Sequence, residues 1–387
     1  MAASRTRVAL MGATGSIGTQ TIDVLRQEPE HFELVALSGG RRIVELAALV
    51  NEFSVRHVAV SDDDDRRRLA ELVDDGVDIV VGEKGLRELS SSADVVVNAV
   101  MGFAGLPVTL ATLEAGARLA LANKESLIAA APLVASVRST PGAQILPVDS
   151  EHCAIHQCLV GSTQPGHPDV ARLLLTASGG PFRGWSSEQL ALVTKADALA
   201  HPTWSMGPKI TIDSSTLMNK GLEVLEASAL FGVAVERIDV VVHPQSIVHS
   251  MVEYVDGSVL AQLSEPDMRL PIAYCLGSPT RLAHRWGRLD FTRTFSLEFQ
   301  PPDREAFPAL DLAYAAARRG GAAPAWLSAA NEVCVEAFLE DRIRWSDIIP
   351  LVARTMDDYV DDPLADLNAV VANDAQARRI THGNLPQ

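Results

Sequence analysis

The stretch RVALM at residues 7–11 leads directly into GATGSIG at residues 12–18. The apolar run predicts a β-strand, and the G-x-x-G-x-x-G pattern predicts a tight turn that opens a helix. Glycines in such a turn let the backbone approach a pyrophosphate, while the N–H groups of the helix N-terminus attract its negative charge. A structural turn without a ligand is the alternative. The strand before the turn and the helix after it favour dinucleotide binding.

Short apolar runs alternate with helix-like segments through the first 148 residues. Besides residues 7–11, the predicted strands are 32–37, 57–60, 78–81, 95–99, 118–121 and 144–148. This alternation is typical of a parallel sheet that is covered by helices. The sequence therefore predicts an α/β protein with a Rossmann-like N-terminal domain at residues 1–148.

The second predicted strand ends in Ser38-Gly39-Gly40-Arg41-Arg42. This stretch lacks the acid that would accept a hydrogen bond from the ribose 2′-hydroxyl of NAD, and it offers two guanidinium groups instead. Guanidinium groups suit the 2′-phosphate of NADP. The alternative is ordinary surface charge at the start of a helix.

The stretch Val148-Asp149-Ser150-Glu151-His152 places two carboxylates two residues apart at the end of an apolar run. On an extended chain, residues i and i+2 project to the same face. Two carboxylates together make half of a divalent-cation site, and we expect Glu223 to supply the third. The alternative is a strand that ends in a solvated polar turn.

The middle of the chain changes pattern after Glu151. Residues 170–178 predict a strand, and residues 247–254 and 258–263 predict a hairpin joined by an Asp-Gly turn. The polar segment 201–207 is interpreted either as a mobile lid or as a fixed loop. Hydroxyl, amide and ammonium groups at residues 213–220 suit a phosphate at a helix start. We therefore predict a central α+β domain at 149–298, a linker at 299–307 and a helical C-terminal domain at 308–387.

Two pairs of histidines, His152 with His156 and His243 with His249, invite a metal interpretation. The chain has no H-E-x-x-H pattern, and the carboxylates are a better set of ligands. Structural roles, or roles in supporting the ligands, are therefore expected for these imidazoles.

Composition limits the class of protein. The chain has 387 residues, with 33 Lys plus Arg against 49 Asp plus Glu, so its net charge of −16 disfavours nucleic acid as a partner. The run DDDDRRR at residues 62–68 is interpreted as a solvated helix face held by i,i+4 pairs. No apolar run approaches the roughly 20 residues of a membrane helix. With four cysteines outside any C-x-x-C pair, we expect a cytoplasmic protein whose thiols are reduced and mostly buried.

These motifs together resemble the 1-deoxy-D-xylulose 5-phosphate reductoisomerase family. The resemblance is carried by residues 12–18, 122–126, 148–152, 178–182, 201–209, 213–227, 243–252, 261–272 and 329–339, nearly the whole chain. It implies a homodimer, with 149–298 as its catalytic and dimerisation domain. The implied reaction converts 1-deoxy-D-xylulose 5-phosphate into 2-C-methyl-D-erythritol 4-phosphate in the non-mevalonate isoprenoid pathway. NADPH and either Mg²⁺ or Mn²⁺ are the implied cofactors.

The resemblance also implies roles for individual residues. The metal ligands would be Asp149, Glu151 and Glu223. The substrate oxygens would contact Lys124, Ser150 and Lys220, and its phosphate would contact Ser178, His201, Ser214 and Asn219, with Trp204 closing over it. NADPH would be lined by Thr14, Gly15, Ser16, Ile17, Gly40, Arg41, Arg42, Asn123, Glu125 and Gly207.

Two other functions fit part of this pattern. Another NADP-dependent oxidoreductase could use the metal site for a hydroxyacid, and its product would keep the carbon skeleton of its substrate. A nucleotide-sensing module could use the carboxylates for a structural cation, although three acids beside a phosphate-binding cluster exceed what a sensor requires.

Overall fold

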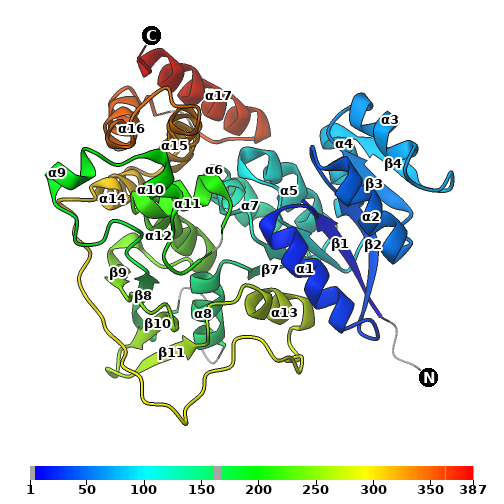
Figure 1. The fold of residues 1–387 in the computed structure, drawn as a ribbon, viewed down its shortest axis with the longest axis horizontal. Coiled ribbons are helices and arrows are strands. Elements are labelled where there is room, and N and C mark those ends of the chain that lie inside the picture. Colours follow the sequence, from blue (N-terminus) through cyan, green and yellow to red (C-terminus); the bar gives the residue numbers. More distant parts are fainter. Residues whose placement is uncertain (1–4, 161–166, 205, 362, 387) are drawn as a thin grey trace. The chain divides into compact units, whose positions relative to one another are not determined.

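In the computed structural model, residues 5–160, 167–204, 206–361 and 363–386 are described. They form two compact units (Figure 1). The first unit comprises the chain up to Ser126 together with Val134–Ser150 and Asp267–Trp286, and the second comprises Leu127–Leu133, Glu151–Pro266 and the chain from Gly287 onward. The domains with boundaries at residues 148, 298 and 307 stay a prediction, because they divide the chain by role and not by compactness.

The first unit contains a parallel sheet. Within the described residues its strands are β1 (Thr6–Met11), β2 (Phe32–Ser38), β3 (His57–Val60), β4 (Asp78–Val81), β5 (Val95–Asn98), β6 (Arg118–Leu121) and β7 (Gln144–Pro147). They are ordered β4-β3-β2-β1-β5-β6-β7, and every neighbouring pair is parallel. The predicted Rossmann-like sheet is confirmed, and each predicted strand is present within one residue of its expected bounds.

Helices cover this sheet because its strands are apolar on both faces. Those of the first unit are α1 (Ser16–Gln27), α2 (Ile43–Phe53), α3 (Asp63–Ala70), α4 (Gly82–Ser90), η1 (Gly102–Gly105), α5 (Leu106–Glu114) and α13 (Arg269–Gly277). Two more, α6 (Lys124–Ala129) and α7 (Ala131–Val137), contain a boundary between the units. Although α13 is distant in sequence, its Ile272 joins the core around Leu10 and Ile22, and α13 packs on α1.

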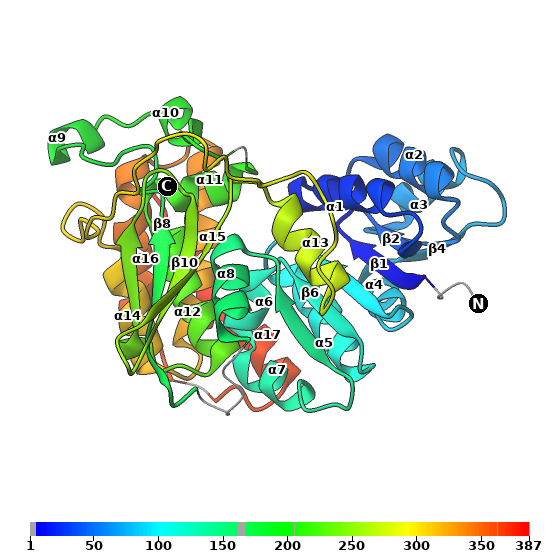
Figure 2. The same ribbon diagram turned by 90° about the horizontal axis from the view of Figure 1, so that it is seen from below.

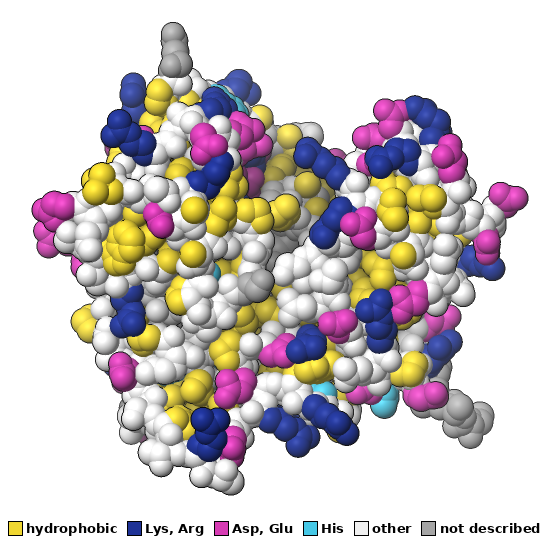
Figure 3. All heavy atoms as spheres, viewed as in Figure 1, with side chains coloured by type: hydrophobic (Ala, Val, Ile, Leu, Met, Phe, Trp, Pro, Cys, Tyr) yellow, Lys and Arg dark blue, Asp and Glu magenta, His cyan; other side chains and the backbone are white. Residues whose placement is uncertain are grey.

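The acidic and basic run of residues 62–68 lies on α3, which confirms a solvated helix face. Asp62 caps the helix by accepting a hydrogen bond from the Asp65 backbone N–H at 2.9 Å. The ion pairs, however, join residues three apart, such as Arg66 with Asp63 at 2.9 Å and Arg68 with Asp65 at 3.3 Å. The expected i,i+4 spacing of the ion pairs was therefore wrong. Residues three apart are also neighbours on a helix surface, so the same charges pair at that spacing instead. Basic and acidic side chains lie side by side around α3 in Figure 3.

The second unit contains a mixed sheet. Its described strands are β8 (Val170–Ala177), β9 (Ile238–Val242), β10 (Val248–Tyr254) and β11 (Val259–Leu263), in the order β11-β10-β8-β9. The predicted hairpin is β10 with β11, and the Asp-Gly turn is present with Gly257 at φ +84°. The helices that precede or separate these strands are α8 (Ser150–Leu159), α9 (Ser187–Leu190), α10 (Lys195–Leu199), α11 (Pro208–Ser215), α12 (Met218–Phe231) and η2 (Val235–Arg237).

The C-terminal part is helical, as the apolar spacing predicted. It contains α14 (Ala309–Arg319), α15 (Ala323–Leu339), η3 (Trp345–Asp347), α16 (Ile348–Asp357) and α17 (Leu367–Asn384). Figure 2 shows α14 and α15 on one side of the strands of this unit. Among the residues that the structure describes, no helix combines the length and the apolar character needed to cross a membrane.

Candidate active site

The glycine-rich turn lies at the carboxyl end of β1. Its first glycine, Gly12, has φ +88°, and a Cβ atom there would lie 2.4 Å from the Ala99 carbonyl oxygen. A Cβ atom on Gly18 would lie 2.3 Å from the Gly12 carbonyl oxygen. Both positions therefore require glycine, the first for the turn and the second for the close packing of α1 on the turn. Thr14 and Gly15 complete the turn, and Ser16 and Ile17 are the first residues of α1, so the free N–H groups of this helix start lie where a pyrophosphate would bind.

The two arginines that follow β2 lie at the same edge of the sheet. Gly12 N–H donates to Ser38 Oγ at 2.9 Å, which joins the turn to the end of β2. Gly40, Arg41 and Arg42 come next, and all three are exposed. Contact between these guanidinium groups and a 2′-phosphate stays a prediction.

The stretch after β6 holds a buried lysine. Lys124 is 5% exposed, and its ammonium group pairs with the carboxylate of Asp149. The preceding residue fixes this position, because Asn123 Nδ2 donates to the carbonyl oxygens of Val100 at 2.6 Å and Gly102 at 2.7 Å. Asn123 Oδ1 also accepts from the backbone N–H of Ser126 at 2.8 Å. The Asn123 side chain is thus occupied by the backbone, and Glu125 follows Lys124 in the first turn of α6.

The geometric argument for Asp149 and Glu151 was wrong. The strand β7 ends at Pro147 and the helix α8 begins at Ser150, so the chain is not extended between the two carboxylates. An acid just before a helix is favoured by the positive end of the helix dipole, which explains why the helix starts directly after Asp149. Glu151 lies in the first turn of α8, where its carboxylate pairs with Lys220.

The helix α12 carries the remaining charged residues of the predicted site. Lys220 Nζ lies 2.9 Å from Glu151 Oε1 and also pairs with the carboxylate of Glu223, and Asn219 donates to that carboxylate as well. Lys220 is 3% exposed and Glu223 is fully buried. Both glutamate carboxylates thus pair with the ammonium group of Lys220. The only metal-ligand atoms that these two side chains offer are oxygens. Such a donor set fits Mg²⁺ or Mn²⁺ better than it fits zinc.

The predicted phosphate residues Ser178 and His201 are in contact. His201 Nδ1 accepts from the backbone N–H groups of Thr203 at 3.2 Å and Trp204 at 3.0 Å. The neutral imidazole must then carry its hydrogen on Nε2, which lies 3.1 Å from Ser178 Oγ and donates to it. Burial lowers the pKa of His201, which favours this neutral form.

The third predicted phosphate residue, Ser214, lies in the last turn of α11 and not at a helix start as expected. The helical conformation is interrupted between α11 and α12 at Leu217, whose φ is +60°. Gly180 packs closely on the backbone of Ser214, because a Cβ atom on Gly180 would lie 2.6 Å from the Ser214 carbonyl oxygen. The loop that carries Ser178 is therefore packed on the backbone of Ser214.

The segment 201–207 connects α10 to α11, and its Ser205 lies outside the described residues. The Trp204 ring is half-buried, and its centroid lies 6.2 Å from that of His249. Gly207 precedes α11, and its carbonyl oxygen accepts from Thr211 Oγ1 at 2.9 Å. Movement of this segment as a lid stays a prediction.

The histidines contact protein groups that explain their positions. His243 Nδ1 donates to the Glu298 carbonyl oxygen at 2.8 Å, and its Nε2 accepts from the Ile247 backbone N–H at 3.2 Å. His152 Nε2 donates to the Glu223 carbonyl oxygen at 3.0 Å, so this buried imidazole links α8 to α12. The structural role expected for His152 is therefore confirmed, although the sequence alone did not identify Glu223 as its partner.

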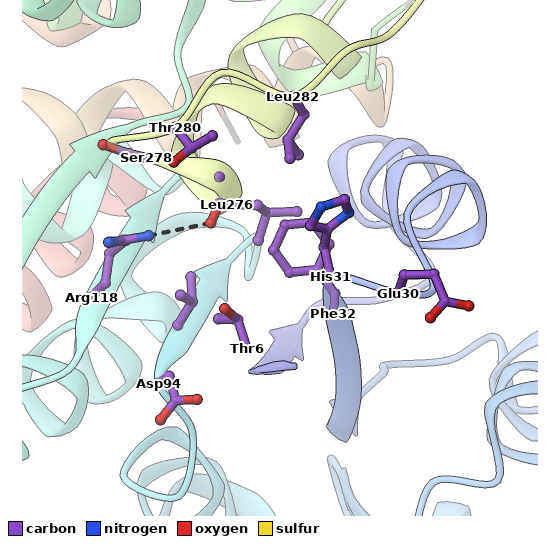
Figure 4. A pocket seen from close by; sticks show the side chains of 12 residues that line it. Thr6, Glu30, His31, Phe32, Asp94, Arg118, Leu276, Ser278, Thr280 and Leu282 are labelled. Carbon is purple, nitrogen blue, oxygen red and sulfur yellow. Dashed lines mark hydrogen bonds between the residues drawn. The ribbon is translucent and has the colours of Figure 1, made fainter. Parts of the chain in front are cut away.

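A cavity of about 420 Å³ lies elsewhere in the first unit (Figure 4). Its lining includes Thr6, Phe32, Val95 and Arg118, the first residues of β1, β2, β5 and β6. The cavity is therefore at the amino edge of the sheet, whereas ligands of open α/β sheets bind at the carboxyl edge. None of the predicted site residues lines it.

A Rossmann-like sheet with a glycine-rich turn defines the class of dinucleotide-dependent oxidoreductases. Within that class, the model of 1-deoxy-D-xylulose 5-phosphate reductoisomerase matches residues 8–131, and two models of the C-terminal domains of this enzyme match residues 145–231 and 263–380. The chain belongs to the 1-deoxy-D-xylulose 5-phosphate reductoisomerase family.

Individual relatives match over almost their full length. The 1-deoxy-D-xylulose 5-phosphate reductoisomerase of Heliobacterium modesticaldum is 50% identical over 96% of both chains, and that of a Synechococcus strain is 48% identical over 97% of both. The Zymomonas mobilis enzyme, solved in complex with NADPH, superposes with a TM-score of 0.90 at 41% identity, covering 98% of this chain and 99% of its own. A DOX-P reductoisomerase solved with NADPH, fosmidomycin and magnesium gives 0.91 at 41% identity and 98% coverage of both.

Proposed function

We propose that the chain catalyses the NADPH- and divalent-metal-dependent rearrangement and reduction of 1-deoxy-D-xylulose 5-phosphate to 2-C-methyl-D-erythritol 4-phosphate in the non-mevalonate isoprenoid pathway. The observation that carries this proposal is the cluster of the half-buried Glu151 and the buried Glu223 around the buried Lys220, in a chain nearly half identical to enzymes of that name. In this reaction the C3–C4 bond breaks, a C2–C4 bond forms, and a hydride reduces the resulting aldehyde.

Asp149, Glu151 and Glu223 would hold Mg²⁺ or Mn²⁺. A bound divalent cation would stabilise the negative charge that develops on the substrate oxygens, and NADPH would supply the hydride. The chain's own groups near these carboxylates are the ammonium groups of Lys124 and Lys220 and the hydroxyl of Ser150. They would orient the ketone and hydroxyl oxygens of the substrate.

The phosphate of the substrate would bind to Ser178, His201, Ser214 and Asn219. The hydrogen-bond pattern supports this role for Ser178, because its Oγ accepts from His201 Nε2 and from the Gly180 backbone N–H at 3.2 Å. Its own hydrogen is then directed to a third acceptor, and a phosphate oxygen is a suitable one. Trp204 would cover the bound substrate and exclude water from the reacting carbons.

NADPH would bind at the carboxyl edge of the parallel sheet, with its pyrophosphate on the glycine-rich turn and its 2′-phosphate near Arg41 and Arg42. The turn supports this role through its two obligatory glycines and the free N–H groups at the start of α1. Gly40, Asn123, Glu125 and Gly207 would complete the site, Asn123 by fixing the backbone beside Lys124.

We also propose a homodimer. Its support is β11, an edge strand on which Val259 and Leu260 are 47% and 50% exposed. Exposed apolar edge strands tend to pair with another strand, and a second copy of the chain would cover both the apolar side chains and the strand edge.

For the three-domain division, the proposed roles are NADPH binding at 1–148, catalysis and dimerisation at 149–298, and support by the helices at 308–387 after the linker.

A cytoplasmic location is proposed from the cysteines and the cofactor. All four cysteines are buried free thiols, and burial raises the pKa of Cys158 to about 11 and that of Cys334 to about 12. Such thiols are poorly reactive, and they suit a reducing compartment that also supplies NADPH.

Replacing Glu223 with Gln tests the metal assignment. The change keeps the size of the side chain but removes a buried negative charge, so we expect turnover to fall at least about a hundredfold, as it does when a group acting on developing charge is lost. NADPH affinity, measured by fluorescence, should stay nearly unchanged. Product analysis belongs to the same assay, because an unrearranged carbon skeleton would indicate the hydroxyacid oxidoreductase.

The matched control is Glu226→Gln, which alters a buried glutamate in the same helix. It should raise the Mg²⁺ concentration for half-maximal turnover much less than Glu223→Gln does. Full activity of Glu223→Gln at saturating Mg²⁺ would refute the metal site.

A further inference from the structure

The two residues that flank Ser214 each accept a buried hydrogen bond from the C-terminal helical part of the chain. Asn331 Nδ2, on α15, donates to Asp213 Oδ1 at 2.7 Å. Trp345 Nε1, on η3, donates to Ser215 Oγ at 2.8 Å. Asp213 and Ser215 are each 1% exposed, and Asn331 is fully buried. The end of α11 is therefore tied at two points, one on each side of Ser214.

These two ties act on the same short stretch from different elements. In Figures 1 and 2, α11 lies beside α15, and the two helices are in contact. Asp213 is also paired with Lys209 Nζ at 2.8 Å, one helical turn earlier, so its carboxylate is held from both ends. The hydroxyl of Ser215 donates to the Ile212 carbonyl oxygen at 2.7 Å, which leaves its lone pair for the indole N–H of Trp345.

The opposite side of Ser214 is limited by the loop that carries Ser178. Gly180, at φ +67°, packs so closely on the Ser214 carbonyl oxygen that no side chain would fit there. The backbone of Ser214 is thus held between this loop and the two hydrogen bonds from the C-terminal helices. A shift of α11 along its axis would move Ser214 relative to Ser178 and His201 together.

We propose that Asn331 and Trp345 are positioning residues for substrate phosphate binding, acting through Asp213 and Ser215 on the hydroxyl of Ser214. This inference rests on the proposed function in one respect, namely that Ser214 contacts the phosphate. Hydrogen bonds to phosphate oxygens need donor distances close to 2.7–3.0 Å, so a small displacement of the donor weakens them steeply. The C-terminal helices therefore contribute to ligand affinity without touching the ligand.

The test compares Trp345→Phe with Trp326→Phe. Both changes remove a buried indole N–H donor from the helical part, since Trp326 Nε1 donates to Asn373 Oδ1 at 3.0 Å, but it is the Trp345 indole that donates to a residue of α11. The probe is a phosphonate that carries a metal-chelating hydroxamate, measured as a dissociation constant with Mg²⁺ and NADPH present. Trp345→Phe should weaken it about three- to tenfold, the range of one neutral hydrogen bond, and Trp326→Phe should not.

Additional variants separate the possible failures. Asn331→Leu should resemble Trp345→Phe, and Ser215→Ala should remove the same tie from its other end; NADPH affinity should stay unchanged in all of them. Equal weakening in Trp345→Phe and Trp326→Phe would overturn the inference, because it would indicate a general loss of packing. Weakening by Ser214→Ala without weakening by Trp345→Phe would overturn the positioning role alone, whereas no effect of Ser214→Ala would overturn the phosphate role of Ser214 as well.

Discussion

His201 shows how the surroundings of one residue decide its chemistry. Its Nδ1 faces two backbone N–H donors, so a proton on that nitrogen would meet two donors and no acceptor. Together with burial, this arrangement favours the neutral imidazole, whose pKa is lowered from its usual value. An incoming phosphate dianion would act in the opposite direction, because negative charge near Nε2 favours the imidazolium form.

We therefore predict two titration midpoints for His201. In the ligand-free protein, NMR should give a midpoint below the ordinary histidine value of about 6.5, and a bound phosphonate should raise it. The pKa of His201 is lower in the folded protein than in the unfolded chain, so the unfolded chain takes up a proton first as the pH falls. His201 therefore lowers the free energy of unfolding as the pH falls below about 6.5, and it has no such effect above that pH. A midpoint that the phosphonate leaves unmoved would argue against His201 as a phosphate residue.

Arg41 and Arg42 are the residues whose role the sequence suggests most directly. Replacing both with Ala should weaken NADPH by about tenfold and leave NADH nearly unchanged, a modest value for charged hydrogen bonds since both groups are exposed to solvent. Binding is measured by fluorescence titration with each cofactor. Removing Arg67 and Arg68 from α3 takes the same charge from the same unit and serves as the control; an equal loss for NADPH and NADH in the Arg41 and Arg42 variant would assign them to general surface charge.

Residue identity was easier to predict than residue geometry. Glu223 was expected to be the third carboxylate beside Asp149 and Glu151, and the structure pairs both Glu151 and Glu223 with Lys220. The extended geometry assumed for Asp149 and Glu151 failed, because the short stretch after an apolar run does not reveal whether a strand continues or a helix begins. Asn331 could not be associated with Asp213 at all, since no local pattern relates residues so far apart in sequence.

At the scale of elements, alternating apolar runs predicted the parallel sheet well because its strands are buried on both faces. The strand β9 was missed, although its sequence IDVVV is rich in β-branched residues. It follows η2 closely and pairs in parallel with β8, more than 60 residues earlier by the register Leu173 with Ile238. A hairpin such as β10 with β11 gives a turn signal between its strands, whereas a parallel pair gives none.

The segment 201–207 is the element for which a movement is predicted. Its polar, proline-containing sequence provides little apolar surface to hold it against the protein without a ligand. Amide hydrogen exchange of this segment should slow when NADPH and a phosphonate hydroxamate bind together, and Trp204→Ala should reduce inhibitor affinity. Full protection already in the free protein, unchanged by the inhibitor, would identify a fixed loop.

At the scale of the whole molecule, the helical C-terminal part was predicted from spacing alone. Leu327, Ala330, Cys334 and Ala337 recur on one face of α15, and each is fully buried. The same periodicity could not reveal what the buried face would contact. Trp345 donates a hydrogen bond from this helical part to Ser215, next to Ser214 of the candidate site. A region whose sequence indicates only helix packing therefore also contacts the residues around that site.

The proposed homodimer yields a prediction about the assembled molecule. Replacing both Val259 and Leu260 with Lys places two charges on the exposed edge strand β11, where they would have to be desolvated on pairing, so we expect the variant to remain a monomer. Sedimentation equilibrium should give twice the chain mass of 41.4 kDa for the unmodified protein and a single chain mass for the variant. Val44→Lys is the matched control, because Val44 is 66% exposed on α2 in the other unit and should leave the dimer intact. If the unmodified protein sediments as one chain, or if the variant still dimerises, β11 is not the interface.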